Sequence, residues 1–139
     1  MKKRTQVSHI MTTEMITVSI QDDLRKVKEL MKKNHIRHVP VVSGEELMGI
    51  ISQTDLMRLS FGNLFDGQEQ ADEAIFDMLK LDQVMVKHPK TIAADDTIKD
   101  VAEYLTEVEF HALPVVDGKR LVGIVTTTDV IKYLLEQYN

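Results

Sequence analysis

Cysteine is absent from the 139-residue chain, which excludes disulfide bonds, thiolate metal ligands and cysteine nucleophiles. Long apolar runs are absent too, since no stretch approaches the roughly 18 residues that a membrane-spanning helix requires. Polar residues interrupt the apolar positions near the start, which is not the pattern of a signal peptide. We therefore expect a cytoplasmic protein that does not enter a membrane.

An excess of positive charge is also missing. The chain has 17 Lys and Arg residues against 22 Asp and Glu residues, and its net charge is −5. The one basic run, Lys2-Lys3-Arg4, is a short terminal tail and offers no electrostatic footprint for nucleic acid. We expect no nucleic-acid partner.

Sequence patterns for catalysis are lacking as well. The chain shows no Ser-His-Asp arrangement, no pair of catalytic carboxylates and no Walker-type phosphate loop. Its histidines do not follow a spacing such as His-x₃-His that would place two ligands on one helix face. We expect no enzyme activity, no metal site and no required cofactor.

Proline and glycine are scarce, with three and six residues, and most of them recur 74 residues apart. Because these residue types restrict or permit particular backbone geometries, their recurrence indicates a repeated fold. Two equivalent halves imply a cleft between them where a ligand could bind. The recurring pairs include Met11 and Met85, Thr17 and Thr91, Asp22 and Asp96, Pro40 and Pro114, Gly44 and Gly118, Gly49 and Gly123, and Asp55 and Asp129.

The first half predicts the element order β-α-β-β-α. Asp22 is the expected N-cap of its first helix, which ends near Asn34 in basic residues and a turn former. Thr54 or Asp55 is expected to cap the second helix, which starts at Leu56. The expected strands lie at residues 15–18, 38–42 and 47–51.

The second half predicts the same order. Asp95 or Asp96 is expected to cap its first helix, and the last helix is expected to begin after Asp129. The strands are expected at residues 91–92, 112–116 and 121–125.

A connector without a counterpart, residues 61–80, separates the halves. We expect a turn-rich loop followed by a helix over residues 69–80. The inner face of this helix is expected to consist of Ala74, Ile75, Met78 and Leu79. The connector either covers the side of the core or exposes apolar side chains to a partner, namely Phe61, Leu64 and Phe65.

Polar side chains gather where each hairpin runs into the following helix. Residues 49–55 read GIISQTD and residues 123–129 read GIVTTTD. A strand that ends in hydroxyl residues and opens a helix places hydroxyls beside free backbone N–H groups, which suits a phosphate. Asp55 and Asp129 could each accept two hydrogen bonds from a cis-diol such as ribose. The same residue types are common N-caps without any ligand, but capping requires one of them rather than three.

These motifs resemble the tandem cystathionine-β-synthase (CBS) domain module, often called a Bateman module. The family signature is a hydrophobic-Pro-Val-Val strand followed by a hairpin and Gly-hydrophobic-hydrophobic-Thr/Ser-x-x-Asp. Here it occurs as residues 39–42 with 49–55, and as residues 113–116 with 123–129. The resemblance implies an α/β (α+β) fold of two pseudo-symmetric β-α-β-β-α repeats. It places the repeats at residues 7–60 and 81–138.

The resemblance also implies an adenosine-containing ligand, such as AMP, ADP, ATP or S-adenosylmethionine, in the cleft between the repeats. In such modules the last Asp of the signature holds ribose, and the hydroxyl residues before it contact ribose or phosphate. A basic residue before the Pro meets phosphate, and the adenine lies near the first strand. The implied nucleotide-binding residues are Thr17, Val18, Arg37, His38, Pro40, Ser52, Thr54, Asp55, Thr91, Ile92, His111, Pro114, Thr126, Thr128 and Asp129.

The two halves differ at the basic positions, where Arg37-His38 of the first half correspond to His111-Ala112 of the second. Ala112 stands where the first half has His38, so the second half offers fewer cationic contacts and the two pockets are not expected to be equivalent. His38 and His111 could equally be strand residues that bind nothing.

The resemblance implies a stand-alone regulatory module that senses an adenine nucleotide or adenosyl derivative and acts on an unidentified protein. The alternative is a structural dimerisation or interaction module without a ligand. In either case we expect a homodimer, because CBS modules usually pair through helices and Leu134 and Leu135 would otherwise be partly exposed.

Overall fold

The computed structural model describes residues 4–59, 74–107 and 111–138. These residues form two compact units, one of residues 16–89 and one that combines residues 1–15 with residues 90–139. The units do not coincide with the two sequence repeats, because the segment that leads each repeat belongs to the unit of the other one.

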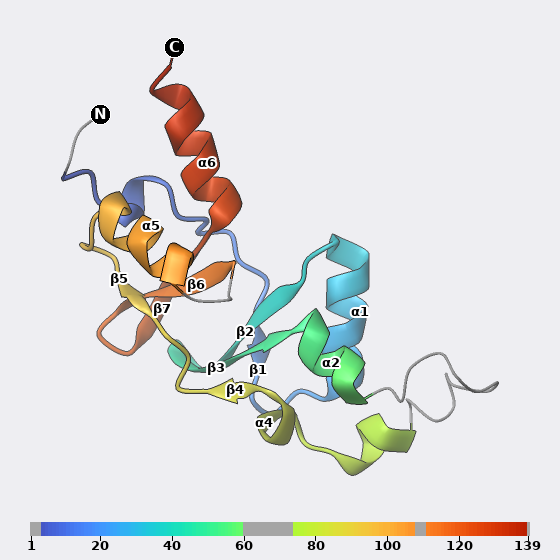
Figure 1. Cartoon of the computed structure of the whole chain (residues 1–139). Coiled ribbons are helices and arrows are strands. Elements are labelled where there is room, and N and C mark those ends of the chain that lie inside the picture. Colours follow the sequence, from blue (N-terminus) through green and yellow to red (C-terminus); the bar gives the residue numbers. More distant parts are fainter. Residues whose placement is uncertain (1–3, 60–73, 108–110, 139) are drawn as a thin grey trace. The chain divides into compact units, whose positions relative to one another are not determined.

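The unit of residues 16–89 contains the predicted order β-α-β-β-α (Figure 1). Its elements are β1 (Val18–Ser19), α1 (Leu24–Asn34), β2 (His38–Ser43), β3 (Glu46–Ser52) and α2 (Gln53–Leu59), followed by α4 (Leu81–Val84) and β4 (Val86–Lys87). Strand β1 pairs in parallel with β2, β2 pairs antiparallel with β3, and β3 pairs antiparallel with β4. The crossover from β1 to β2 is made by α1, as a parallel pair requires.

The second unit repeats this order (Figure 1). It contains a 3₁₀ helix (Val7–His9), β5 (Ile92–Ala93), α5 (Ile98–Glu107), β6 (Ala112–Asp117), β7 (Arg120–Thr126) and α6 (Thr127–Glu136). Strands β5 and β6 are parallel, and β6 and β7 form an antiparallel hairpin. The predicted fold of two β-α-β-β-α repeats is confirmed.

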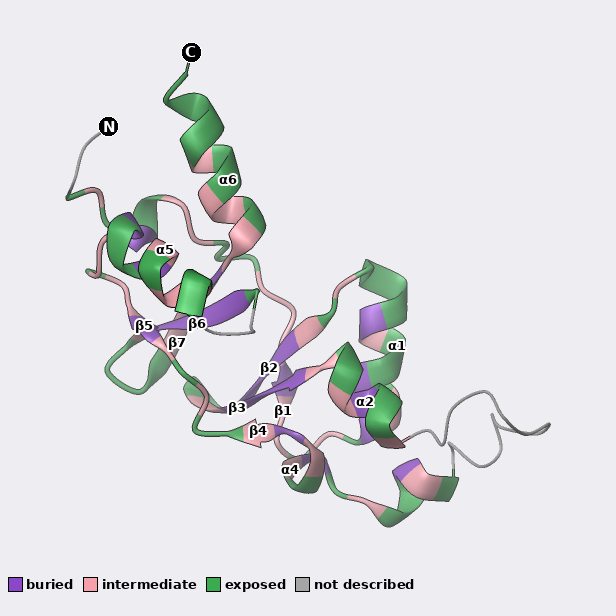
Figure 2. Cartoon of the chain, viewed as in Figure 1, coloured by how far each residue is buried: buried purple, intermediate pink, exposed green. Residues whose placement is uncertain are grey.

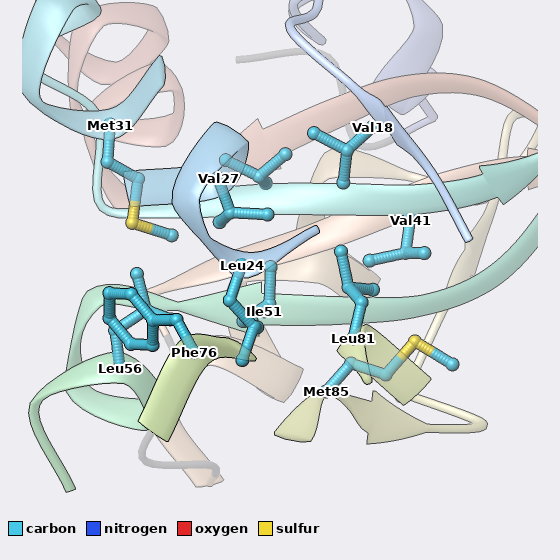
Figure 3. Close-up of a cluster of buried hydrophobic side chains, with 11 residues drawn as sticks. Val18, Leu24, Val27, Met31, Val41, Ile51, Leu56, Phe76, Leu81 and Met85 are labelled. Carbon is cyan, nitrogen blue, oxygen red and sulfur yellow. The ribbon is translucent and has the colours of Figure 1, made fainter. Parts of the chain in front are cut away.

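Each unit has its own hydrophobic core. In residues 16–89, the apolar stripe of α1 at Leu24, Val27 and Met31 packs against strand residues such as Ile51 (Figure 3). The second core centres on the corresponding strands β6 and β7 and includes Val7 from the N-terminal segment. Purple segments in Figure 2 mark both cores, whereas α6 carries no buried residue.

The segments that lead the two repeats occupy equivalent places in the two units. Val7 is fully buried among residues of the second repeat, and Leu81 and Met85 are buried among residues of the first. Main-chain hydrogen bonds join Thr12 to Ile124 in one unit, and the β3–β4 ladder pairs Ile50 with Val86 in the other. Each hairpin is therefore completed by the leading segment of the other repeat.

The N-caps of the first helix in each repeat differ from those predicted. Asp23 caps α1 by accepting from the N–H of Lys26 at 2.9 Å, whereas Asp22 accepts from the N–H of Ser19. Before α5, Thr97 accepts from the N–H of Asp100 at 3.1 Å. The aspartates at equivalent positions, Asp22 and Asp96, instead close the turn that follows the short strand, since Asp96 accepts from the N–H of Ala93.

The start of the second helix in each repeat was also predicted too late. Helix α2 begins at Gln53 and α6 at Thr127, so neither Thr54 nor Asp55 is a cap. The last residue of the preceding strand, Ser52 or Thr126, has this role. Because the last residue of the strand is also the N-cap of the helix, no linker separates the hairpin from the helix.

Two further expectations need correction. The short strands lie at Val18–Ser19 and Ile92–Ala93, one residue or more beyond the predicted positions. In the connector, residues 74–78 are helical, but Phe76 is the buried residue and Met78 is 81% exposed, contrary to the predicted inner face. Phe61, Leu64 and Phe65 lie outside the described residues. Within the described parts of the chain, no helix has both the length and the apolar character needed to span a membrane.

Candidate functional site

The hairpin register brings the predicted site residues of the first repeat to one end of the sheet. His38 is paired with Ser52, and the carbonyl of Arg37 accepts from the N–H of Gln53 at 2.8 Å. Strand β1 runs parallel to β2 with Val18 opposite Val41, so Thr17 enters the sheet at this same end. We call this group the first corner and define it as Thr17, Arg37, His38, Ser52, Thr54 and Asp55.

The first corner is held together by a reciprocal capping box. The N–H of Ser52 donates to Oδ2 of Asp55 at 2.9 Å, and the N–H of Asp55 donates to Oγ of Ser52 at 3.1 Å. Oδ1 of Asp55 lies 3.8 Å from Nη1 of Arg58, a cation whose side chain is 76% exposed. Asp55 therefore has a structural role at the start of α2 and is also close to a positive charge.

The second corner, defined as Thr91, His111, Thr126, Thr128 and Asp129, has the same construction. The N–H of Thr126 donates to Oδ2 of Asp129 at 2.9 Å, and the N–H of Asp129 donates to Oγ1 of Thr126 at 3.1 Å. The carbonyl of His111 accepts from the N–H of Thr127 at 2.9 Å. The residue paired with Thr126 across the hairpin is Ala112, which is buried.

The corners leave polar groups at the surface for a ligand. Thr54 and Thr128 are exposed, and Asp55 and Asp129 are half-buried. An ionised carboxylate has about four lone-pair sites, so one capping hydrogen bond leaves acceptor capacity for a diol. Each corner can thus offer a carboxylate and hydroxyl groups together, and basic side chains adjoin them.

Four of the predicted nucleotide-binding residues have buried side chains. Val18 and Ile92 are at most 1% exposed and belong to the two cores, and Pro40 and Pro114 are buried as well. Their side chains are not available at the surface. Any contribution of these positions to a ligand must come from the backbone.

The capping boxes and the position of Arg58 beside Asp55 were not predicted. A hydroxyl residue followed three positions later by an acidic residue is the pattern of a capping box, and both Ser52–Asp55 and Thr126–Asp129 follow it. Asp55 and Arg58 have the i, i+3 spacing of neighbours on a helix surface. Both patterns were visible in the sequence.

Asp22, in the turn after β1, has a shifted pKa. The hydrogen bond from the N–H of Ser19, at 2.8 Å, holds the pKa of Asp22 below its ordinary value. Partial burial opposes this shift, and Lys26, whose Nζ lies 3.2 Å away, reinforces it. This turn follows β1 at the end away from the first corner, so we assign Asp22 a structural role.

An acidic hollow lies along α5, outside the predicted site. It has a volume of about 430 Å³ and is lined by Asp96, Asp100, Glu103, Tyr104 and Glu107. Nζ of Lys90 lies 4.5 Å from the centre of the Tyr104 ring. No group of three or more His, Cys, Asp or Glu residues in the described ranges is arranged to hold a metal ion.

Comparison with known proteins agrees with this arrangement. The sequence model of the CBS domain matches residues 7–62 and again residues 81–136. The chain belongs to the CBS domain family. The predicted resemblance to a tandem CBS module is thereby confirmed.

Several known proteins are similar to almost the whole chain. Protein MJ1404 of Methanocaldococcus jannaschii is 31% identical over 96% of this chain and 33% of its own length. The crystal structure of MJ1225 from the same organism is 29% identical with a TM-score of 0.83, covering 96% of this chain and 49% of that one. This CBS chain thus spans a third to a half of the length of these relatives.

A second similar structure contains ligands. It is the CBS domain pair of protein MJ0100 in complex with 5′-methylthioadenosine and S-adenosyl-L-methionine. The pair is 25% identical to this chain with a TM-score of 0.72, and the match covers 97% of this chain and 98% of that one.

Proposed function

We propose that this CBS pair is a regulatory module that binds adenosine-containing ligands at its two corners. The observation that carries the proposal is the register of each hairpin, which gathers a threonine, a basic residue, a hydroxyl residue and an aspartate at one end of that hairpin. The same combination is built twice, in two units with separate cores. A capping function alone accounts for Ser52 and Asp55 but not for the adjoining Thr17 and Arg37.

The residue roles follow the chemistry of each group. Asp55 and Asp129 accept hydrogen bonds from the ribose hydroxyls through the capacity that capping leaves free. The hydroxyls of Ser52, Thr54, Thr126 and Thr128 contact ribose or phosphate. Arg37, His38 and His111 face the phosphate, for which a guanidinium is suited because it can donate two parallel hydrogen bonds. Backbone groups around Thr17 and Thr91 bind the adenine.

The ligand class is supported by the MJ0100 pair. Methylthioadenosine and S-adenosylmethionine, which that pair binds, share an adenosine unit with AMP, ADP and ATP. Because the shared unit contains the ribose diol and the adenine, the same class is the first to test here.

The test is thermal unfolding of the purified chain with AMP, ADP, ATP, S-adenosylmethionine and methylthioadenosine. A ligand present at about a hundred times its Kd stabilises the folded state by about 2.7 kcal/mol, which raises the midpoint by several degrees. GTP at equal concentration is the control for nonspecific effects of charge. If no adenosine compound raises the midpoint, the proposal is wrong.

We also propose that the module pairs with a second copy of itself through α6. Three apolar residues of this helix, Ile131, Leu134 and Leu135, are 41–60% exposed and lie on one face, and Tyr138, just after the end of the helix, continues the i, i+3, i+4, i+7 spacing and is 79% exposed. A second copy would offer the same face and would cover both stripes at once. This exposed stripe is the observation that favours a dimerisation role, whether or not a ligand is bound.

The regulated activity lies outside the residues described. No catalytic arrangement accompanies the corners, whose aspartates take part in helix capping. We propose that ligand binding is the module's own activity and that its effect is exerted on another domain or protein.

A further inference from the structure

The two corners carry different charges at equivalent positions. At the start of β2, Arg37 is exposed and His38 lies across the hairpin from Ser52. At the start of β6, these positions hold His111 and the buried Ala112. The second corner therefore has His111 where the first has the permanently charged Arg37. It has the methyl side chain of Ala112 where the first has the imidazole of His38.

The helices that precede the two corners, α1 and α5, also differ in charge at their C-terminal ends. The last turn of α1 carries Lys32 and Lys33, both exposed. The last turn of α5 carries no basic residue, and Glu103 and Glu107 line the acidic hollow on its surface. Two cations adjoin this hollow: Nζ of Lys99 lies 3.8 Å from Oε1 of Glu103, and Lys90 lies over the ring of Tyr104. The chain thus reaches the first corner from a basic helix end and the second corner from an acidic one.

The two aspartates also differ in their surroundings. Oδ1 of Asp55 lies 3.8 Å from the guanidinium of Arg58. The residue equivalent to Arg58 is Lys132, and among the described residues no ion pair joins it to Asp129. A guanidinium is therefore held beside one corner and not beside the other.

These differences affect how well each corner can bind a phosphate group. A nearby cation attracts phosphate and a nearby carboxylate repels it, and both effects weaken with distance. A charge-assisted hydrogen bond to phosphate is stronger than a neutral one, and Arg can form two in parallel. An uncharged or cationic group in the same place gains nothing from Arg37.

We propose that the two corners select different adenosine compounds. The first corner takes a ligand that carries phosphate, that is, an adenine nucleotide. The second corner takes an adenosine compound without phosphate, with a neutral or cationic group at the 5′ position. This inference rests on the proposed function and adds a division of ligand class between the repeats.

The experiment measures each corner separately by isothermal titration calorimetry with AMP and adenosine, which differ only in the phosphate. Asp129→Asn leaves the first corner intact, and Asp55→Asn leaves the second. The Asn side-chain oxygen can still accept the capping hydrogen bond, so both variants are expected to fold. Circular dichroism and thermal unfolding without ligand verify this.

With Asp129→Asn, we expect AMP to bind at least about ten-fold more tightly than adenosine, the size of one charge-assisted hydrogen bond. With Asp55→Asn, we expect AMP to bind no more tightly than adenosine. Adding Arg37→Ala to Asp129→Asn should remove most of the preference for AMP, and Arg37→Lys should restore part of it. Lys119→Ala is the control, because it removes one positive charge from the exposed turn of the β6–β7 hairpin.

An equal preference for AMP at both corners, or a stronger preference at the second, would overturn the inference. So would an unchanged preference in the Arg37→Ala variant. If neither compound binds the unmodified chain, the proposed function itself fails, and the absence of any binding heat distinguishes that result from a failure of the charge argument alone.

Discussion

Met11 lies directly against Gly123, so that a Cβ added to this glycine would meet the Met11 sulfur at 2.6 Å. The equivalent pair in the other unit is Met85 and Gly49, where the same distance is 2.7 Å. In both cases the methionine leads one sequence repeat and the glycine lies in the hairpin of the other. The recurrence of Met and Gly at a spacing of 74 residues is therefore explained by packing of each leading segment on the other repeat's hairpin.

Alanine at these two glycines should destabilise the fold, and Gly49→Ala should cost more than Gly123→Ala. At Gly49 the new Cβ would also meet the backbone oxygen of Val86 at 2.7 Å, whereas the closest contacts at Gly123 are with the flexible Met11 side chain. Overpacking of this kind costs about 1–3 kcal/mol. Urea unfolding measures the difference.

A second substitution separates the two cases. Met11→Ala in the Gly123→Ala background should recover part of the lost stability, because it removes the side chain that is crowded. Met85→Ala should recover less in the Gly49→Ala background, since the Val86 oxygen remains. Equal recovery in both backgrounds would contradict the distances given above.

Ser52→Ala and Asp55→Asn should differ in their effect on stability. Ser52→Ala removes the hydroxyl that caps α2 and should lower the free energy of unfolding by about 1 kcal/mol. Asp55→Asn keeps an oxygen that can accept from the N–H of Ser52, so its stability should change little, while its nucleotide affinity should fall.

Urea unfolding and calorimetry with AMP measure these two properties on the same samples. Thr126→Ala and Asp129→Asn are the matched pair in the second repeat. If Asp55→Asn and Asp129→Asn both bind every adenosine compound as the unmodified chain does, the assignment of the ribose contacts is wrong.

Stability should depend on pH through Asp22. Its folded-state pKa is lowered chiefly by the N–H of Ser19, so the charged form is favoured in the folded protein. The resulting stabilisation is fully present above the pKa of the unfolded chain, about 4 for Asp, and is lost as the pH falls through the lower folded-state pKa. Asp22→Asn should therefore flatten the pH dependence of the unfolding free energy in this acidic range.

The control for this measurement is Asp23→Asn, because Asp23 also accepts a backbone hydrogen bond but is exposed. Chemical unfolding between pH 7 and pH 3 compares the three chains. If Asp22→Asn keeps the slope of the unmodified chain, Asp22 does not contribute to it.

Leu135→Gln should weaken self-association. Leu135 is 60% exposed in the apolar stripe of α6, and a polar side chain there would reduce the area that a second copy can bury. Glu136→Gln is the matched control, since it introduces the same side chain at the next position of the helix. Analytical ultracentrifugation over a range of concentrations measures the effect. A stable monomer of the unmodified chain at micromolar concentration would remove the basis for this proposal.

The strands and most helices could be predicted from local patterns. The apolar spacing of α1 at Leu24, Val27 and Met31 places one face in the core, and the Gly44 and Gly118 turns, with φ of 62° and 64°, close the hairpins as expected. Helix starts were predicted less well, because several polar residues in succession could serve as caps. Asp22 and Asp23 are both chemically suitable, and the choice depends on the turn that the Ser19 N–H forms with Asp22.

The connector shows a different kind of error. Met78 has the spacing of an inner-face residue but is exposed, and Phe76 is buried instead. Asp77 forms an ion pair with Arg25 at 2.7 Å, and Lys28 lies over the Phe76 ring, so contacts with α1 orient this segment. The limits of the two repeats, at residues 7–60 and 81–138, and the roles of the site residues stay predictions.

The sequence by itself determined the repeat, the order of elements and the family, because these depend on residues whose effects are local: prolines, glycines in turns, and apolar side chains at regular spacing. It also placed the hydroxyl residues and aspartates at the two corners. Only the tertiary structure decided that each leading segment completes the hairpin of the other repeat. This depends on which groups meet in space, since the close approach of Met11 to Gly123 joins residues 112 positions apart in the chain.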